Sequence, residues 1–347
     1  MTRLAVVLFN LGGPDRLEAV EPFLFNLFND PAIIGAPGPV RWLLAKVLSR
    51  RRAPVAREIY GRMGGRSPLL DQTRAQGAAL EMALGGDTRV FIAMRYWHPL
   101  TEETVAEVAA WKPDQIVLLP LYPQFSRTTS GSSVRAWEKA AARARLVVPT
   151  SVVCCYPEAT GWVGAMAGLV RKGLTEAGRA GSPRVLFSAH GLPKRVIAAG
   201  DPYQKQVERT AAAVVGALGI PGLDWVVCYQ SRVGPMEWIG PSTDDEIRRA
   251  GRDGVPVVVV PTAFVSEHSE TLVELDIEYR HLAETAGVPA YIRVPTVGTD
   301  PLFIEALAEL VHAAATTGIG VVSWTPGGGA MCQDTIEGCC NRRKVGA

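Results

Sequence analysis

The feature that most constrains the fold of this chain is an alternation of short, continuously apolar segments with longer amphipathic ones. The apolar segments are rich in valine, leucine and isoleucine, which is typical of strands that are buried on both faces. They cover residues 4–9, 88–94, 115–119, 151–155, 184–187, 225–229, 255–260 and 290–294. Helix-like stretches separate them, at 68–84, 102–110, 133–142, 162–177, 202–218, 267–286 and 301–316. This order predicts an α/β protein with parallel sheets covered by helices.

The length and an internal similarity predict two such sheets. A chain of 347 residues is long enough for two domains of about 150 residues each. Residues 8–14 resemble 186–193, and residues 117–126 resemble 258–266, in the same order in each half. Either a duplication or the general likeness of buried strands explains this. We expect two Rossmann-like halves, 1–158 (joined by the C-terminal helix 301–316) and 159–300, followed by a cysteine-bearing tail at 317–347.

Composition excludes several classes of protein. Hydrophobic residues make up 48% of the chain and charged residues 20%, which are globular proportions. The net charge of +2 argues against a partner that is a nucleic acid. No apolar run reaches the roughly 18 residues of a membrane-spanning helix. Six cysteines without a secretory signal predict reduced thiols and a cytoplasmic location.

One segment predicts contact with a membrane surface. Arg50, Arg51 and Arg52 follow an apolar group that comprises Trp42, Leu43, Leu44, Val47 and Leu48. Apolar and basic residues together suit peripheral binding to an anionic bilayer. The alternative is a helix that packs on its own domain and has a solvated end. Oligomeric state is not readable from the sequence.

The loops that follow the predicted strands contain the residues best placed for chemistry, because ligands of doubly wound sheets bind at the carboxyl ends of strands. His190 directly follows the strand at 184–187, where it could transfer protons, bind a metal or simply bond to local backbone. The run 126–133 opens a helix with hydroxyl side chains, so it is either an anion site or a helix cap. Neither of the usual glycine-rich phosphate loops occurs.

An acidic ladder follows the strand at 255–260. At about 100° per residue, an α-helix from Glu267 would place Glu270, Glu274 and Glu278 on one face, with His268 in its first turn. This face is either solvated or a path that conducts protons or hard cations into a cleft.

The C-terminal cysteines predict a metal site. Cys332, Cys339 and Cys340 follow a glycine-rich segment, and three thiolates need a fourth ligand to close a site. Cys154 and Cys155 are the candidates, and only one should reach the site because neighbours on a strand point apart. Cys228 is interpreted as a buried small hydrophobe. Zinc and an iron–sulfur cluster both suit these ligands.

Six ordered motifs resemble those of the ferrochelatases, enzymes that insert ferrous iron into a porphyrin in the last step of haem synthesis. The likeness extends from about Val7 to Leu310. The motifs lie at residues 10–14, 95–103, 122–126, 187–193, 229–235 (with Trp238, Gly240 and Pro241) and 264–272. The resemblance implies a chelatase-type fold of two α/β halves around a porphyrin cleft, with porphyrin and ferrous iron (Fe2+) as substrates.

The resemblance also assigns roles to residues of this chain. His190 and Glu270 match the active-site pair that handles pyrrole protons, iron or both, and Glu274, Glu278 and His268 match a proton or metal path. The matches to porphyrin-binding residues are Leu11, Tyr60, Arg95, Tyr96, Ser126 and Trp238. The product expected from protoporphyrin IX is haem.

The tail resembles the extension of family members that carry a [2Fe-2S] cluster. Animal members have an internal ligand at the position of Arg127, so Cys154 or Cys155 would supply it here. Two alternatives to a protoporphyrin enzyme stay open: a coproporphyrin ferrochelatase, and a non-enzymatic thiolate metal sensor or haem-binding module. Without the resemblance, the alternative is an anion-binding Rossmann-like transferase that uses residues 126–133.

Overall fold

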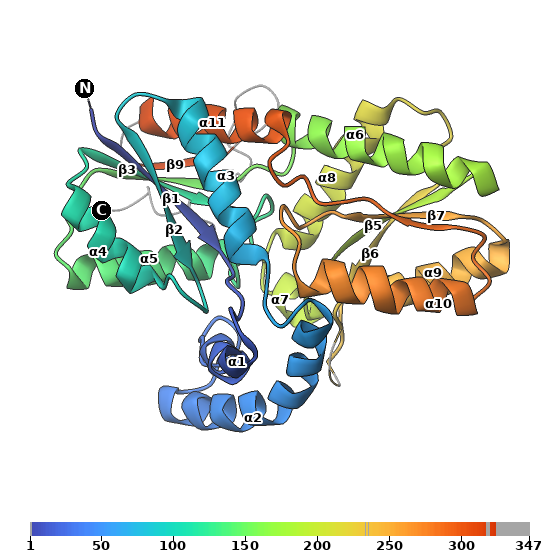
Figure 1. Ribbon diagram of the computed structural model, residues 1–347, viewed down its shortest axis with the longest axis horizontal. Coiled ribbons are helices and arrows are strands. Elements are labelled where there is room, and N and C mark those ends of the chain that lie inside the picture. The colour runs from blue at the N-terminus through green and yellow to red at the C-terminus, as the bar shows by residue number, and fades with distance from the viewer. Residues whose placement is uncertain (1, 233, 235, 317–319, 324–347) are drawn as a thin grey trace. The chain divides into compact units, whose positions relative to one another are not determined.

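The computed structural model describes residues 2–232, 234, 236–316 and 320–323 (Figure 1). The chain forms two compact units. Unit 1 is built mainly from Met1–Cys154 and Ala308–Val322, and unit 2 mainly from Cys155–Leu307. Helix α11 (Pro301–Thr316) therefore begins in unit 2 and ends in unit 1.

Unit 1 contains a five-stranded sheet in the order β2-β1-β3-β4-β9. β1 lies between β2 and β3 and is parallel to both, with Leu4 opposite Thr88 and Gln115. Its strands are β1 (Leu4–Asn10), β2 (Thr88–Met94), β3 (Gln115–Pro120), β4 (Thr150–Cys155) and β9 (Gly320–Ser323). Helices α4 (Thr101–Trp111) and α5 (Ser130–Arg143) pack on one face through a core that includes Val7, Phe9 and Trp137. α3 (Leu69–Leu84) packs against β1 and β2.

Two further helices of unit 1 follow the end of β1. α1 (Val20–Phe28) packs against the long α2 (Gly38–Arg62). α2 has Pro54 inside it, and its buried positions are mostly small or polar (Ala45, Ser49, Ala53 and Tyr60), so it has little of the apolar stripe by which helices are recognised. The helix-like stretches predicted from the apolar pattern therefore did not include α2, and a helix at this segment was only the alternative to membrane contact.

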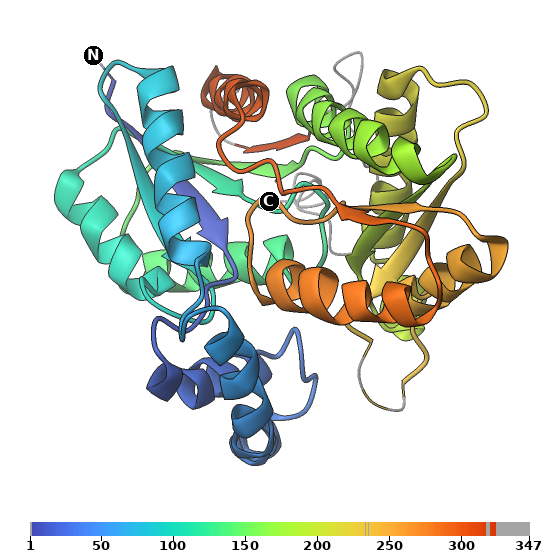
Figure 2. The same cartoon turned by 45° about the vertical axis from the view of Figure 1, so that its right-hand side comes forward.

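Unit 2 contains a four-stranded parallel sheet in the order β6-β5-β7-β8. Its strands are β5 (Arg184–His190), β6 (Trp225–Gln230), β7 (Val257–Pro261) and β8 (Tyr291–Arg293). Helices α6 (Thr160–Ala177) and α8 (Tyr203–Leu218) lie on one side of it, and α9 (Thr243–Asp253) and α10 (Tyr279–Thr285) on the other (Figure 2). The short α7 (Lys194–Ala198) follows β5. A nine-residue π-helix, η3 (Glu270–Glu278), leads directly into α10.

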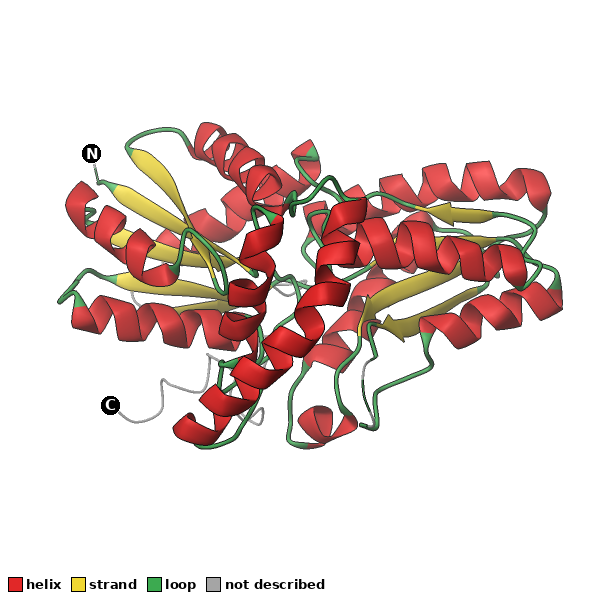
Figure 3. Ribbon diagram, turned by 60° about the horizontal axis from the view of Figure 1, so that its bottom comes forward, coloured by secondary structure: helices red, strands yellow, loops and turns green. Residues whose placement is uncertain are grey.

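The two sheets share one strand order, since the first strand of each lies between the second and the third. In each unit the strands lie between helices, drawn in yellow and red in Figure 3. The predicted α/β fold with two parallel sheets is therefore confirmed, and all eight predicted strands occur within a few residues of their expected ends. The strand β9 was not predicted, because four residues are too few to show a pattern.

The prediction of an α-helix from Glu267 is wrong in two respects. Glu267 and His268 precede the helix, which begins at residue 269. At residues 270–278 the turns are wider and follow the i→i+5 pattern of a π-helix. No helix among the described residues is both long enough and apolar enough to cross a membrane.

Candidate functional site

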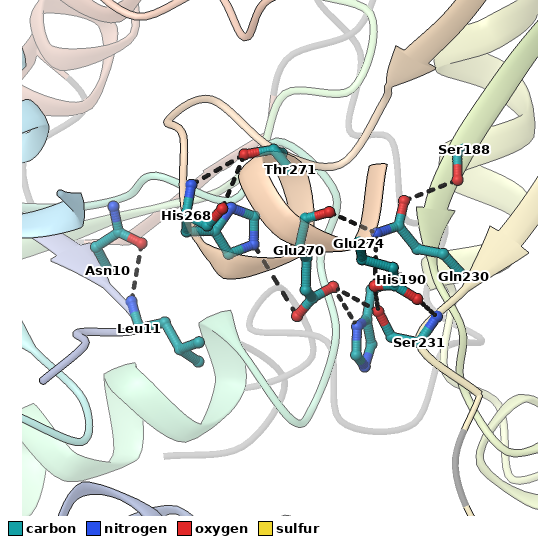
Figure 4. A network of polar contacts seen from close by, with 10 residues as sticks. All are labelled: Asn10, Leu11, Ser188, His190, Gln230, Ser231, His268, Glu270, Thr271 and Glu274. Carbon is teal, nitrogen blue, oxygen red and sulfur yellow. Dashed lines mark hydrogen bonds and ion pairs between the residues drawn. The ribbon is translucent and has the colours of Figure 1, made fainter. Parts of the chain in front are cut away.

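The parallel pairing of β5 with β6 brings two polar strand ends together in unit 2. His190 and Gln230 are the last residues of their strands and lie opposite each other in the register. The Gln230 amide is held in place by Ser188, whose hydroxyl donates to its Oε1 at 2.8 Å (Figure 4). The sheet thus fixes an imidazole and an amide side by side at its carboxyl edge, as the rule for parallel sheets predicts.

His190 makes a close contact with the first residue of the π-helix. Its Nδ1 lies 2.8 Å from Oε2 of Glu270 (Figure 4). Burial alone would lower the pKa of His190, but the charge and hydrogen bond of Glu270 raise it above its usual value. Burial alone would raise the pKa of Glu270, but His190 is the main cause that lowers it to about 2. Glu270 therefore stabilises the protonated form of His190, and His190 stabilises the carboxylate form of Glu270.

A second carboxyl group lies beside this pair, joined to it by one hydroxyl. Ser231 Oγ lies 2.9 Å from Glu270 Oε2 and 2.5 Å from Glu274 Oε2. Ser231 also donates its backbone N–H to Glu274 Oε1 at 2.8 Å. Burial, followed by the negative charge of Glu270, raises the pKa of Glu274. Two neighbouring carboxyl groups with oppositely shifted pKa values are typical of acid–base sites.

The local backbone is adapted to these contacts. Ser231 has a φ of +60°, in the left-handed region that few residues other than glycine adopt. The π-helix is anchored by Arg293, which donates to Asp276 Oδ1 at 2.9 Å and to Glu267 Oε1 at 2.6 Å. Gln230 donates from Nε2 to Glu274 Oε2 at 3.1 Å and more weakly to the Glu270 carbonyl at 3.4 Å. Long π-helices are rare and frequently occur at functional sites.

His268 lies on the other side of Glu270. Its Nε2 is 4.0 Å from Glu270 Oε1, and its ring packs against Phe264 with the centroids 4.5 Å apart. Among the described residues, its buried Nδ1 has no hydrogen-bond partner. Burial lowers the pKa of His268, so the ring is neutral and keeps a lone pair. A neutral imidazole suits metal binding as well as proton transfer.

Glu278, the last member of the predicted acidic path, is exposed at the end of the π-helix. The residue after it, Tyr279, is buried instead, and its Oη lies 3.2 Å from Glu274 Oε1. The structure therefore brings together His190, Glu270, Glu274 and His268 from the predicted set.

A different polar cluster surrounds Arg95 in unit 1, directly after β2. Asp30 is buried and its Oδ2 accepts from Tyr96 Oη at 2.8 Å, from Ser132 Oγ at 2.5 Å and from Arg95 Nη2 at 2.8 Å. Ser132 Oγ in turn accepts from Arg95 Nε at 2.8 Å. Burial would raise the pKa of Asp30, but Arg95 and these donors together lower it. Arg95 and Tyr96 are thus both held in place by the carboxylate of Asp30, whose lowered pKa favours the ionised form.

The remaining residues that were predicted to bind porphyrin are distributed over both units. Leu11 directly follows β1, and its N–H donates to Asn10 Oδ1 at 2.8 Å (Figure 4). Tyr60 is buried on α2, and Ser126 is buried with its Oγ 2.8 Å from Thr128 Oγ1. Trp238 is half-buried in unit 2. Their roles stay predictions.

The cysteines divide into two groups. Cys332, Cys339 and Cys340 lie outside the described residues. Cys154 and Cys155 end β4 and are both buried, and Gln206 Nε2 donates to Cys155 Sγ at 3.5 Å. Burial raises the pKa of the Cys228 thiol to about 12, which keeps it neutral. Within the part of the chain that the structure describes, no group of three or more His, Cys, Asp or Glu residues is arranged to hold a metal ion.

Several residues of these clusters were missed by sequence reasoning. Ser231 and Gln230 lie in a quoted motif and after a predicted strand, so their position could have identified them. Asp30 and Tyr279 gave no such indication. Asp30 precedes a proline in a loop, and Tyr279 is a single aromatic residue within the helix-like stretch 267–286.

Comparison with known proteins gives the chain a clear set of relatives. The family model described as ferrochelatase matches residues 3–315. A ferrochelatase of Caulobacter vibrioides (strain NA1000 / CB15N) is 57% identical over 326 residues, which cover 92% of this chain and 93% of the relative. That of Hyphomonas neptunium is 50% identical over 346 residues, covering 97% and 94%.

A solved structure shares the fold at much lower identity. SirB from Bacillus subtilis with Fe3+ matches with a TM-score of 0.53 and 14% identity, over 91% of this chain and 97% of SirB. At this identity the likeness concerns the fold alone. It agrees with the two α/β units described above.

Proposed function

This chain belongs to the ferrochelatase family, enzymes that insert iron into a porphyrin, and we propose that its porphyrin is protoporphyrin IX and its product haem. The observation that supports the reaction chemistry is the contact of His190 Nδ1 with Glu270 at the carboxyl edge of the unit 2 sheet. A free porphyrin carries two pyrrole N–H groups, and both protons must leave as iron enters. A base is therefore required beside the metal's route.

His190 suits the role of that base. Because its Nδ1 is engaged by Glu270, the neutral ring keeps its Nε2 lone pair for another partner. A raised pKa means that the ring binds a proton more strongly, and Glu270 stabilises the imidazolium that results. The same Nε2 lone pair could bind ferrous iron, so His190 and Glu270 serve in this proposal as proton acceptors, as iron ligands or as both. Glu274 and His268 extend the path for protons or metal.

Anaerobic turnover with ferrous iron tests the proposal. We expect haem to form from protoporphyrin IX faster than the corresponding product forms from coproporphyrin, which carries four carboxylates rather than two. Binding of porphyrin without turnover would instead indicate a haem-binding or metal-sensing module. A preference for coproporphyrin would overturn the choice of substrate while leaving the family's reaction in place.

We further propose that the tail carries a [2Fe-2S] cluster held by Cys332, Cys339, Cys340 and one of Cys154 and Cys155. Cys155 fits such a ligand, because its sulfur accepts a hydrogen bond from the Gln206 amide, and hydrogen bonds to ligand sulfurs are a common feature of these clusters. Cys228 does not fit, since its thiol is neutral and lies in the apolar core of unit 2. When bound, the cluster would supply a redox-active or structural centre.

The colour of the protein tests the cluster. Anaerobically purified protein should be reddish-brown, with about two irons per chain. Serine at Cys332, Cys339 or Cys340 should bleach it, and so should serine at one of Cys154 and Cys155. The matched control is Cys228→Ser, which should keep the colour. Protein that contains zinc and no iron would contradict the cluster.

We also propose that the protein is cytoplasmic and binds the membrane surface peripherally through α2. Trp42, Leu43, Leu44 and Val47 are between 41% and 58% exposed, and the exposed Arg50, Arg51 and Arg52 follow them on the same helix. Flotation with anionic vesicles tests this, since Leu43→Glu should weaken binding. An equal affinity of the variant and the unchanged protein for these vesicles would contradict the proposal.

A further inference from the structure

We propose that Tyr279 and Asp244 form the outer part of a hydrogen-bonded chain that carries the pyrrole protons from His190 to the surface of unit 2. This inference rests on the proposed function, in which His190 accepts those protons. It departs from the acidic ladder predicted from the sequence, because the outer positions belong to a phenol and to a carboxylate on a different helix rather than to Glu278.

The inner part of the chain consists of contacts already described. It runs from His190 Nδ1 to Glu270 Oε2 at 2.8 Å, and from there to Ser231 Oγ at 2.9 Å. Ser231 Oγ lies 2.5 Å from Glu274 Oε2. Each step joins two groups that can exchange a proton, and none is longer than an ordinary hydrogen bond.

The outer part continues from the other oxygen of Glu274. Tyr279 Oη lies 3.2 Å from Glu274 Oε1 and 3.1 Å from Asp244 Oδ2. The tyrosine ring is buried in the core of unit 2 beside Leu275 and Ile247, so its hydroxyl has a fixed position. Asp244 is half-buried in the first turn of α9, where the helix dipole favours a negative charge. A proton that reaches Asp244 can therefore pass to water or buffer.

The transfer balances along this route. His190 Nε2 takes a proton from a pyrrole nitrogen, and the resulting imidazolium gives its Nδ1 proton to Glu270. Ser231 accepts a proton from Glu270 and releases its own to Glu274. Tyr279 accepts a proton from Glu274 and releases its own to Asp244. Between passages the His190 ring turns over and the two hydroxyls reorient, which restores a lone pair toward the porphyrin and an N–H toward Glu270. Two such passages then remove the two protons that one ferrous ion replaces, and no electrons are transferred.

The outer part of the chain suits protons and does not suit a metal ion. Burial, followed by the charge of Glu274, raises the pKa of Tyr279 well above its usual value, so the phenol stays neutral and offers no charged ligand. A buried phenol whose hydroxyl lies between two carboxyl groups can relay a proton through that hydroxyl. Loss of this hydroxyl should consequently affect the insertion rate and not the affinity for iron.

The test is single-turnover insertion of ferrous iron into protoporphyrin with enzyme in excess, which removes the contribution of product release. Tyr279→Phe should slow insertion about tenfold at low buffer concentration, because a positioned acid–base group typically contributes at least this much. High concentrations of a small carboxylic acid or imidazole buffer should restore the rate to within about twofold by accepting protons directly. The iron concentration at half-maximal rate should not change. Asp244→Asn should show the same loss and the same rescue.

Tyr291→Phe is the matched control. Tyr291 lies in the same core and donates its hydroxyl to the Leu275 carbonyl at 2.7 Å, so its loss costs a buried hydrogen bond without touching the chain. Its insertion rate should be unchanged. An unchanged rate in both Tyr279→Phe and Asp244→Asn, a slower rate that buffer does not rescue, or a higher requirement for iron would each overturn the proposal. Normal turnover of His190→Ala would instead reject the underlying function.

Discussion

The polar clusters of the two units have opposite electrostatic designs although their sheets share one strand order. Around Arg95 in unit 1, one carboxylate, Asp30, accepts from three donors, and its pKa is lowered. Around His190 in unit 2, two carboxyl groups share a hydroxyl, and the pKa of Glu270 falls while that of Glu274 rises. The first cluster holds a fixed charge and the second can exchange protons.

This contrast shows that the fold supplies positions and not chemistry. Both clusters contain a residue at or just after the end of a strand, His190 in β5 and Arg95 after β2. The neighbouring residues then decide whether that position anchors a group or moves a proton. We expect substitutions in the unit 2 cluster to affect the rate of the reaction, and substitutions in the unit 1 cluster to affect stability and binding.

The largest effect should follow removal of the base. His190→Ala should fold normally and lose about a thousandfold in turnover, because a positioned base typically contributes 10²–10⁴ in rate. Anaerobic turnover and circular dichroism together measure this. If the variant keeps a tenth of the activity or more, His190 is not the base, and the assignment of proton exchange to unit 2 is wrong.

The next effect should be on stability, through the fixed charge of unit 1. Asp30→Asn should lower the free energy of unfolding by about 3 kcal/mol at pH 7, because it leaves the positive charge of Arg95 without its carboxylate. The pKa of Asp30 is lowered by folding, so its contribution is present above the usual aspartate value of about 3.9 and is lost as the pH falls through the folded value. The free energy of unfolding in urea should therefore differ less between Asp30→Asn and the unchanged protein at pH 3 than at pH 7. A difference that does not depend on pH would show that the ion pair is not its cause.

The sequence predicted the units better than it predicted these clusters. Buried strands are continuous apolar segments, which can be recognised in the sequence. The strands and the position of His190 at a strand end could therefore be predicted. The π-helix was not predicted, because an apolar pattern along the chain does not distinguish its i→i+5 turns from those of an α-helix. Asp30 was missed because its partner Arg95 lies far from it in the sequence and only the fold brings the two together.

A smaller effect should come from the His190–Glu270 pair on stability. The pKa of His190 is raised by folding, so its contribution is present below about 6.5 and is lost as the pH rises through the folded value. The pKa of Glu270 is lowered to about 2, so its contribution is present above about 4.3 and is lost as the pH falls toward 2. The pair should stabilise the folded protein most between about pH 4.3 and about pH 6.5.

The size of this effect is limited because the His190 side chain is 40% exposed, and solvent screening reduces such a pair to less than about 1 kcal/mol. The Tm difference between the unchanged protein and His190→Ala should be larger at pH 5.5 than at pH 8.5. A larger difference at pH 8.5 would mean that His190 is buried as the neutral ring and that the two clusters differ less than their contacts indicate.

The smallest effect should be at the exposed end of the π-helix. Glu270 and Glu274 contact Ser231, whereas Glu278 is exposed, where water and salt screen its charge. Glu278→Gln should therefore change turnover by less than about twofold, while Glu270→Gln should be almost as damaging as His190→Ala, with losses in the range typical of acid–base groups. Steady-state assays of these two variants, with Glu274→Gln between them, measure how the effect declines along the helix. Equal damage at Glu270 and Glu278 would contradict this decline, because it would require a path along the helix surface that exchanges protons or metal over its whole length.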